Sequence, residues 1–104
     1  MILLKRNEPG NQAWTLRLLG EVALRGEPPE LETARTRHEQ GRVLAARLGM
    51  RPLEAFCHLG MGITDRRAQQ LASAREHLTT AATAFRALGM SRWLTEAEAE
   101  LRRD

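Results

Sequence analysis

Aromatic residues, cysteine and long apolar runs are all scarce in this chain of 104 residues. With two Trp, two Phe and no Tyr, a core must be built mainly from Leu and Ala, and such cores are usually helical. The single cysteine, Cys57, excludes an internal disulfide and fits a reducing compartment. No uninterrupted apolar run exceeds four residues, which argues against a membrane span and a signal peptide. We therefore expect a cytoplasmic protein without a membrane partner.

Lysine is also nearly absent, because 15 of the 16 basic residues are Arg. The formal net charge is only +3, which does not by itself indicate a nucleic-acid partner. Residues 35–51 hold five Arg against one Glu, but these Arg side chains point in different directions on a helical wheel. The sequence therefore does not favour nucleic-acid binding.

An internal repeat of 40 residues is the main positive feature of the sequence. When residues 11–50 are laid over residues 51–90, eight positions are identical without a gap, and they cluster at three places. A repeat period between about 20 and 50 residues is typical of stacked helical arrays. The identities pair Leu19-Gly20 with Leu59-Gly60, Leu31, Ala34 and Arg35 with Leu71, Ala74 and Arg75, and Leu48-Gly49-Met50 with Leu88-Gly89-Met90.

Each unit predicts two helices, and a fifth helix follows over about residues 91–101. Gly20 and Gly60 lie on apolar helix faces, where we expect a neighbouring helix to approach closely. Gly49 and Gly89 should end the second helices in a left-handed conformation. The predicted fold is all-α, a stack of antiparallel helical hairpins with about five helices. Its parts are 1–10 (a stub or the end of a preceding repeat), repeats 11–50 and 51–90, and a capping helix at 91–104.

Three details of this prediction are less regular. Pro9-Gly10 should stand before the first helix, which we expect at about residues 12–24. The second hairpin has no Gly or Pro in its turn at residues 66–70. In the second helix of the first unit, polar His38 stands where the other unit has Leu78.

In the fifth helix we expect four polar residues to face outwards: Thr95, Glu96, Glu98 and Glu100.

The Leu-Gly pairs, and the spacing of Ala74, Leu78 and Ala81, resemble tetratricopeptide repeats. The stretches "GNQAWTLRLLGEVA" and "AREHLTTAATAFRALGM" are similar to the C-terminal tetratricopeptide-like arrays of some large bacterial signalling proteins. Those proteins join such arrays to nucleotide-cyclase-like or regulatory ATPase modules. The resemblance covers roughly residues 10–103, although the usual repeat has 34 residues. It implies an α-solenoid scaffold for protein–protein contacts and carries over no catalytic chemistry.

No catalytic, cofactor or metal motif stands out. Cys57 and His58 are neighbours on a predicted helix, so their side chains point about 100° apart and do not form a nucleophile–base pair. The three His and one Cys lack metal-ligand spacing. Gly60-Met61-Gly62 lacks the third glycine and the preceding strand of a phosphate loop. We expect a protein that is not an enzyme and needs no cofactor.

The function that the sequence predicts is a non-catalytic scaffold that binds a peptide or protein segment in the groove of the array. Position in the repeat places Arg17, Leu18, Glu21, Cys57, His58 and Met61 in this groove. Trp14 and Leu18 lie off the apolar stripe of their helix. They could anchor a partner, or pack against a preceding repeat or against Ile2–Leu4, and they leave an apolar edge that allows self-association. The expected partner-binding residues are Trp14, Arg17, Leu18, Glu21, His58 and Met61.

An alternative function remains open. The chain could be a regulatory or sensor module that gates an enzyme within a larger bacterial ATPase or nucleotide-cyclase-like signalling protein.

Overall fold

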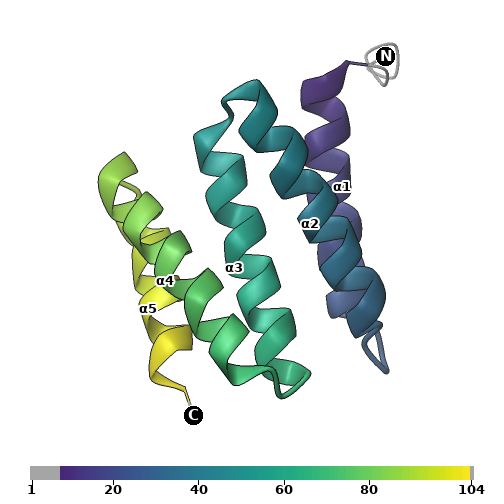
Figure 1. Ribbon diagram of the computed structural model, residues 1–104, viewed down its shortest axis with the longest axis vertical. Helices are drawn as coiled ribbons and strands as arrows, with labels where there is room; N and C mark the ends of the chain where they lie inside the picture. The colour runs from purple at the N-terminus through teal and green to yellow at the C-terminus, as the bar shows by residue number, and fades with distance from the viewer. Residues whose placement is uncertain (1–7, 104) are drawn as a thin grey trace.

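The computed structural model describes residues 8–103, and within them it contains five α-helices and no strand. Helices that follow one another in the sequence pack side by side, and α1 also touches α3 (Figure 1). In the view of Figure 1, α1 and α5 lie behind α2 and α4, and α3 stands between the two pairs. The predicted all-α stack of helical hairpins is confirmed. Its helices are α1 (Pro9–Leu24), α2 (Leu31–Leu48), α3 (Arg51–Arg67), α4 (Leu71–Leu88) and α5 (Ser91–Arg102).

The start of α1 differs from the prediction. Pro9 and Gly10, which we expected to precede the first helix, are its first two residues. Proline suits this place because the first backbone N–H groups of a helix have no partner within the helix, and its φ is already helical. The expected packing of Ile2–Leu4 against Trp14 lies outside the described residues.

The glycines that end α2 and α4 behave as predicted. Gly49 and Gly89 have φ values of 71° and 70°, in the left-handed region. Each turn is closed by a backbone hydrogen bond from the next residue to a carbonyl five residues back, from Met50 to Ala45 and from Met90 to Phe85. This arrangement satisfies carbonyl groups that the end of a helix leaves free.

The turn between α3 and α4 has the same geometry without a glycine. Gln69 adopts a φ of 65°, and the N–H of Gln70 donates to the carbonyl of Asp65 at 2.8 Å. The missing glycine therefore does not change the shape of this turn. Instead, Gln69 adopts the left-handed backbone conformation, which costs free energy in a residue that has a Cβ atom.

His38 occupies the space that Gly20 and Gly60 leave open. The imidazole is fully buried between α1, α2 and α3. A Cβ atom built on Gly20 would lie 2.6 Å from Nδ1 of His38, and one on Gly60 would lie closer still to its Nε2. The close approach predicted at both glycines is confirmed. The polar residue in the apolar stripe of α2 fills the junction of three helices.

Helix α5 contains one correction. Glu100, expected to face the solvent, is mostly buried and forms an ion pair with Arg66 of α3. Arg66 also donates a hydrogen bond from Nη1 to the backbone oxygen of Glu100 at 3.2 Å. Thr95 and Glu96 are exposed as expected. These contacts fasten the C-terminal end of α5 to α3.

Candidate functional site: an aromatic and arginine surface

The four aromatic residues of the chain converge around Phe56 of α3. Its ring centroid lies 4.8 Å from that of Trp93 in an edge-to-face arrangement, 5.4 Å from Phe85 and 6.3 Å from Trp14. These distances fall in the range in which aromatic pairs stabilise one another beyond the area that they bury. Since the rings come from α1, α3, α4 and α5, the cluster joins both hairpins and the last helix.

Two arginines lie over this cluster. The guanidinium carbon Cζ of Arg17 is 4.8 Å from the centroid of the Phe56 ring, and that of Arg92 is 5.4 Å from the Trp93 ring. Both distances permit cation–π contacts. The buried Nε of Arg17 has no hydrogen-bond partner within residues 8–103. We call the five residues Trp14, Arg17, Phe56, Arg92 and Trp93 the aromatic–arginine face.

Three of the predicted site residues belong to this part of α1 or border it. Trp14 is 40% exposed and packs one side of its ring towards Phe56. Leu18, on the outward side of α1, is 54% exposed. Arg17 connects the two, because its side chain reaches from α1 over the Phe56 ring. The structure thus brings Trp14 and Arg17 together and leaves Leu18 on a neighbouring surface.

Glu21 has internal partners. Its Oε2 lies 3.3 Å from Nε2 of His38, and its Oε1 lies 3.4 Å from Nε of Arg25. The hydrogen bond with His38, followed by the charges of His38 and nearby arginines, lowers the pKa of the Glu21 carboxyl despite its burial. Glu21 therefore holds the buried imidazole, and its carboxylate is already engaged.

The expected places of Cys57, His58 and Met61 are wrong. Cys57 and Met61 are buried, and the Sγ of Cys57 packs against Gly41 of α2. Successive residues of a helix are rotated by about 100°, so His58 lies about 200° around α3 from Phe56. It faces α4, where its Nδ1 is 3.1 Å from Nδ1 of His77. These three residues therefore do not share a surface with Arg17.

Sequence reasoning placed Phe56 and Trp93 in apolar stripes and did not find the cluster that they form. The 40-residue repeat gives no signal for it, because that shift places Trp14 over Glu54 and Leu16 over Phe56. The contact between Trp14 and Phe56 depends on the angle at which α1 crosses α3. A repeat pattern does not specify that angle.

The environment of Cys57 does not favour catalysis. Burial is the main cause that raises the pKa of its thiol, to about 12, so the thiol is protonated at neutral pH. Within residues 8–103, no group of three or more His, Cys, Asp and Glu side chains converges as a metal site. The absence of enzymatic activity stays a prediction.

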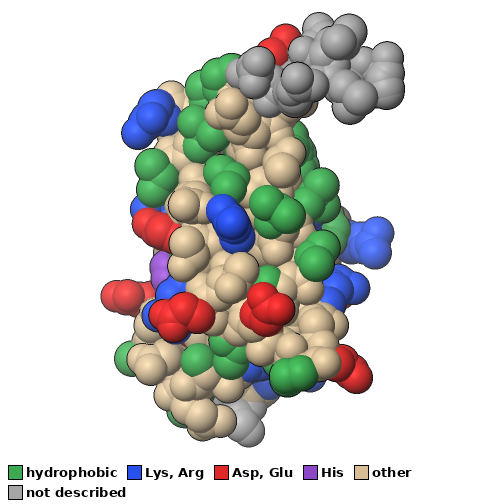
Figure 2. Space-filling model, turned by 90° about the vertical axis from the view of Figure 1, so that its right-hand side faces the viewer, with side chains coloured by type: hydrophobic (Ala, Val, Ile, Leu, Met, Phe, Trp, Pro, Cys, Tyr) green, Lys and Arg blue, Asp and Glu red, His purple; other side chains and the backbone are tan. Residues whose placement is uncertain are grey.

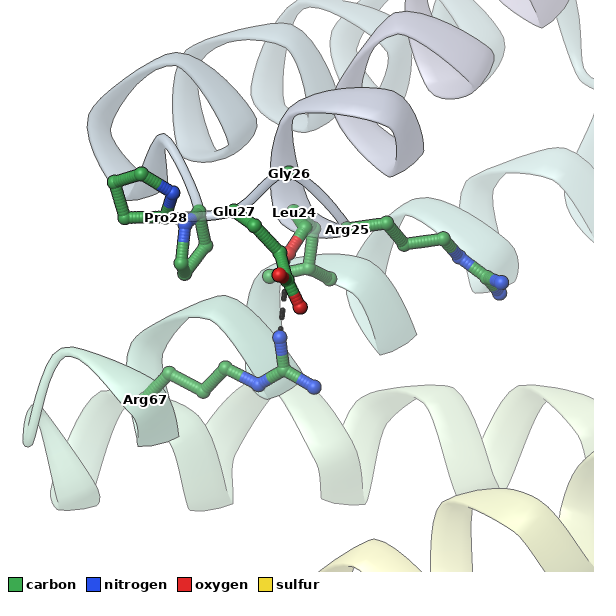
Figure 3. A pocket seen from close by; sticks show the side chains of 7 residues that line it. Leu24, Arg25, Gly26, Glu27, Pro28 and Arg67 are labelled. Carbon is green, nitrogen blue, oxygen red and sulfur yellow. Dashed lines mark hydrogen bonds between the residues drawn. The ribbon is translucent and has the colours of Figure 1, made fainter.

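A hollow beside the turn between α1 and α2 is lined by that turn and by Arg67 of α3 (Figure 3). Arg67 donates a hydrogen bond from Nη1 to the backbone oxygen of Leu24 at 3.2 Å, whereas Arg25 points away (Figure 3). The lining holds one carboxylate, Glu27, and no nucleophile. Its residues therefore tie the first hairpin to α3 and offer no acid–base pair.

Comparison with known proteins adds no further assignment. No family model matches the chain, and neither a curated protein nor a solved structure matches it significantly. None of the helices formed by residues 8–103 has the length and apolar character needed to cross a membrane. Any function of the chain must be inferred from its own residues.

Proposed function

We propose that this chain is a non-catalytic scaffold that binds a protein or peptide segment on the aromatic–arginine face. The observation that carries the proposal is the convergence of all four aromatic rings with Arg17, although aromatics make up only 4% of the sequence. Trp and Arg are the residues that most often dominate the binding energy of protein interfaces. The tetratricopeptide-like character of the repeats belongs to the same proposal.

The chemistry of the face indicates what a partner should supply. An apolar or aromatic side chain can pack on the exposed part of Trp14 and on Trp93. A carboxylate can pair with the half-buried guanidinium of Arg17 or with the exposed Arg92. We therefore expect a segment in which an aromatic or large aliphatic residue lies close to Asp or Glu.

Selection from a displayed library of random peptides tests this proposal. Enriched peptides are synthesised with a fluorophore, and their Kd for the chain is measured by fluorescence anisotropy. We expect Trp14→Ala and Arg17→Glu each to weaken binding at least tenfold, which corresponds to about 1.4 kcal/mol. If no peptide is enriched, or if both variants bind as the parent does, the proposal is wrong.

Leu71 supplies a matched control. It is a large apolar residue that is 59% exposed and begins α4, outside the aromatic–arginine face. Leu71→Ala removes exposed apolar surface outside the face and should leave the Kd unchanged. Circular dichroism spectra of all three variants should match that of the parent chain, because the substituted side chains are partly exposed.

A further inference from the structure

Two histidines face each other on the side of α3 opposite Phe56. Nδ1 of His58 lies 3.1 Å from Nδ1 of His77 on α4, and the ring centroids are 5.3 Å apart. Each ring therefore directs a nitrogen at the other across the interface of two helices. His77 is 27% exposed, so solvent and small ions can reach the pair.

The separation of these nitrogens fits two ligands of one metal ion. Bonds from Zn²⁺ to histidine nitrogen are about 2.0–2.1 Å long, so two such nitrogens lie about 3.4 Å apart at a tetrahedral angle and about 2.9 Å apart at a right angle. The observed 3.1 Å lies between these values. With bonds of this length the ion would lie about 40° off the line that joins the two nitrogens, so both rings must rotate to direct their lone pairs to it.

Charged side chains of α2 also lie near the pair. Glu39 and Arg42 both act on His58 and pair with each other at 2.7 Å, so their opposite charges offset each other beside the histidines.

A buried carboxylate stands behind the second ligand. Oδ2 of Asp65 lies 3.9 Å from Nε2 of His77, the nitrogen that points away from His58. Asp65 is only 2% exposed, and it is held by Arg35 of α2 and by the hydroxyl of Ser73, which donates to Oδ2 at 2.5 Å. Histidines that bind metals commonly have such a carboxylate beside the remote nitrogen, which fixes the orientation of the ring.

We propose that His58 and His77 bind one divalent transition-metal ion of the kind that prefers nitrogen ligands, such as Zn²⁺ or Ni²⁺. The ion links α3 to α4 through the two Nδ1 atoms, and water completes its coordination. Since no third His, Cys, Asp or Glu joins the pair among the described residues, we expect a Kd in the micromolar range. This site lies apart from the aromatic–arginine face, so it stands or falls independently of the proposed function.

Isothermal titration calorimetry with ZnCl₂ and NiCl₂ on the untagged chain at pH 7.5 tests the proposal. We expect one ion per chain, and we expect His58→Gln and His77→Gln each to weaken the Kd at least tenfold. MgCl₂ should give no heat, because Mg²⁺ prefers oxygen ligands. The absence of Zn²⁺ binding at millimolar concentration would mean that the histidines form only a hydrogen-bonded pair, and would overturn the proposal.

Two further variants separate the site from general effects of substitution. Glu76→Gln changes the exposed neighbour of His77 on α4 and should leave the Kd for Zn²⁺ unchanged. Asp65→Asn should weaken the Kd about tenfold, because Asp65 positions His77. Since Asp65 is buried and pairs with Arg35, circular dichroism and a thermal melt first establish that this variant is folded. A Co²⁺ absorption spectrum reports the ligands directly and should lose its intensity in His77→Gln. Equal Zn²⁺ binding by the parent chain and both histidine variants contradicts the proposal.

Discussion

The imidazole of His38 fills a junction that three helices leave between them. It is fully buried, its Nδ1 lies 2.9 Å from the carbonyl oxygen of Ala34, and its Nε2 lies beside Glu21. Gly20 and Gly60 face the ring from α1 and α3 with no side chain in between. The repeated Leu-Gly pair therefore has a physical cause here, since any Cβ at these positions would meet the histidine.

Gly60→Ala is expected to destabilise the fold by about 1–3 kcal/mol, the usual cost of overpacking a core. This cost exceeds the gain of about 1 kcal/mol that alanine offers over glycine within a helix. Urea unfolding followed by circular dichroism measures the difference. Gly10→Ala is the matched control, because the nearest atom to its Cβ is 3.9 Å away, an ordinary contact. If Gly60→Ala is as stable as the parent, the proposed packing of His38 is wrong.

The titration of His58 gives a prediction for the effect of pH. Its pKa in the folded chain is about 4, lowered by burial and then by His77 and Arg42 against the opposing effect of Glu39, while its ordinary value is 6.5. Asp65 is a further charged group near these two histidines, and it lies next to His77. Between these two pH values the unfolded chain binds a proton at His58 that the folded chain does not.

The contribution of His58 to stability is therefore full above pH 6.5, falls as the pH drops through that value, and stops changing below pH 4. The free energy of unfolding, measured in urea from pH 8 to pH 4, should fall less steeply in His58→Gln than in the parent chain. Parallel curves for the two proteins would show that His58 titrates alike in the folded and unfolded states.

The turns between helices show where local sequence signals succeed and where they fail. The ends of α2 and α4 were predicted because an apolar stripe stops at Leu48 and Leu88 and a glycine follows each. The predicted start of α1 was wrong because Pro-Gly is typical both of the segment that follows a helix and of the first turn of a new one. The turn at Gln69 had no signal at all, since its left-handed conformation is set by the packing of α3 on α4.

Gln69→Gly should stabilise the chain by about 1 kcal/mol, because a left-handed backbone costs an ordinary residue about 1–2 kcal/mol and glycine offsets part of this gain with its flexibility when unfolded. A thermal melt or urea unfolding detects the change. Gly89→Ala, at a φ of 70°, should lower the free energy of unfolding by a similar amount. Ala68→Gly, at a φ of −86°, should bring no gain, and a stabilisation there equal to that of Gln69→Gly would contradict the explanation.

The candidate site was predicted only in part, for a reason that lies in helix geometry. Trp14 was identified because it stands off the apolar stripe of α1, and Arg17 because its position in the repeat placed it in the groove. Cys57, His58 and Met61 were assigned to the same groove, yet α3 is covered by α2 and α4 and buries two of them. The face that a central helix leaves open depends on the crossing angles of its neighbours, which residue periodicity does not contain.

At the scale of the whole molecule, α1 presents an apolar edge. Leu18 and Val22 lie one turn apart and are 54% and 69% exposed, and Leu19 is exposed beside them. Figure 2, which shows the side of the molecule formed by α1 and α2, displays hydrophobic side chains spread over this surface among a few charged ones. An apolar surface of this kind is typical of a contact with another protein segment.

We expect this edge to promote self-association of the isolated chain. The molar mass measured by light scattering after size exclusion should rise with protein concentration, and Leu18→Lys combined with Val22→Lys should keep the chain monomeric. The exposed apolar residue Leu71, at the start of α4, provides the control, since Leu71→Lys should not prevent association. A chain that stays monomeric at all concentrations shows that the edge does not pair with a second copy.

The central claim is that the aromatic–arginine face binds a protein segment. The most direct measurement is amide hydrogen exchange of the chain, alone and saturated with a peptide obtained by selection. We predict slower exchange in α1 around Trp14 and Arg17 and in α5 around Trp93, with no change at the exposed side of α2. Protection confined to α2 and α4, or no protection at all, would contradict the account.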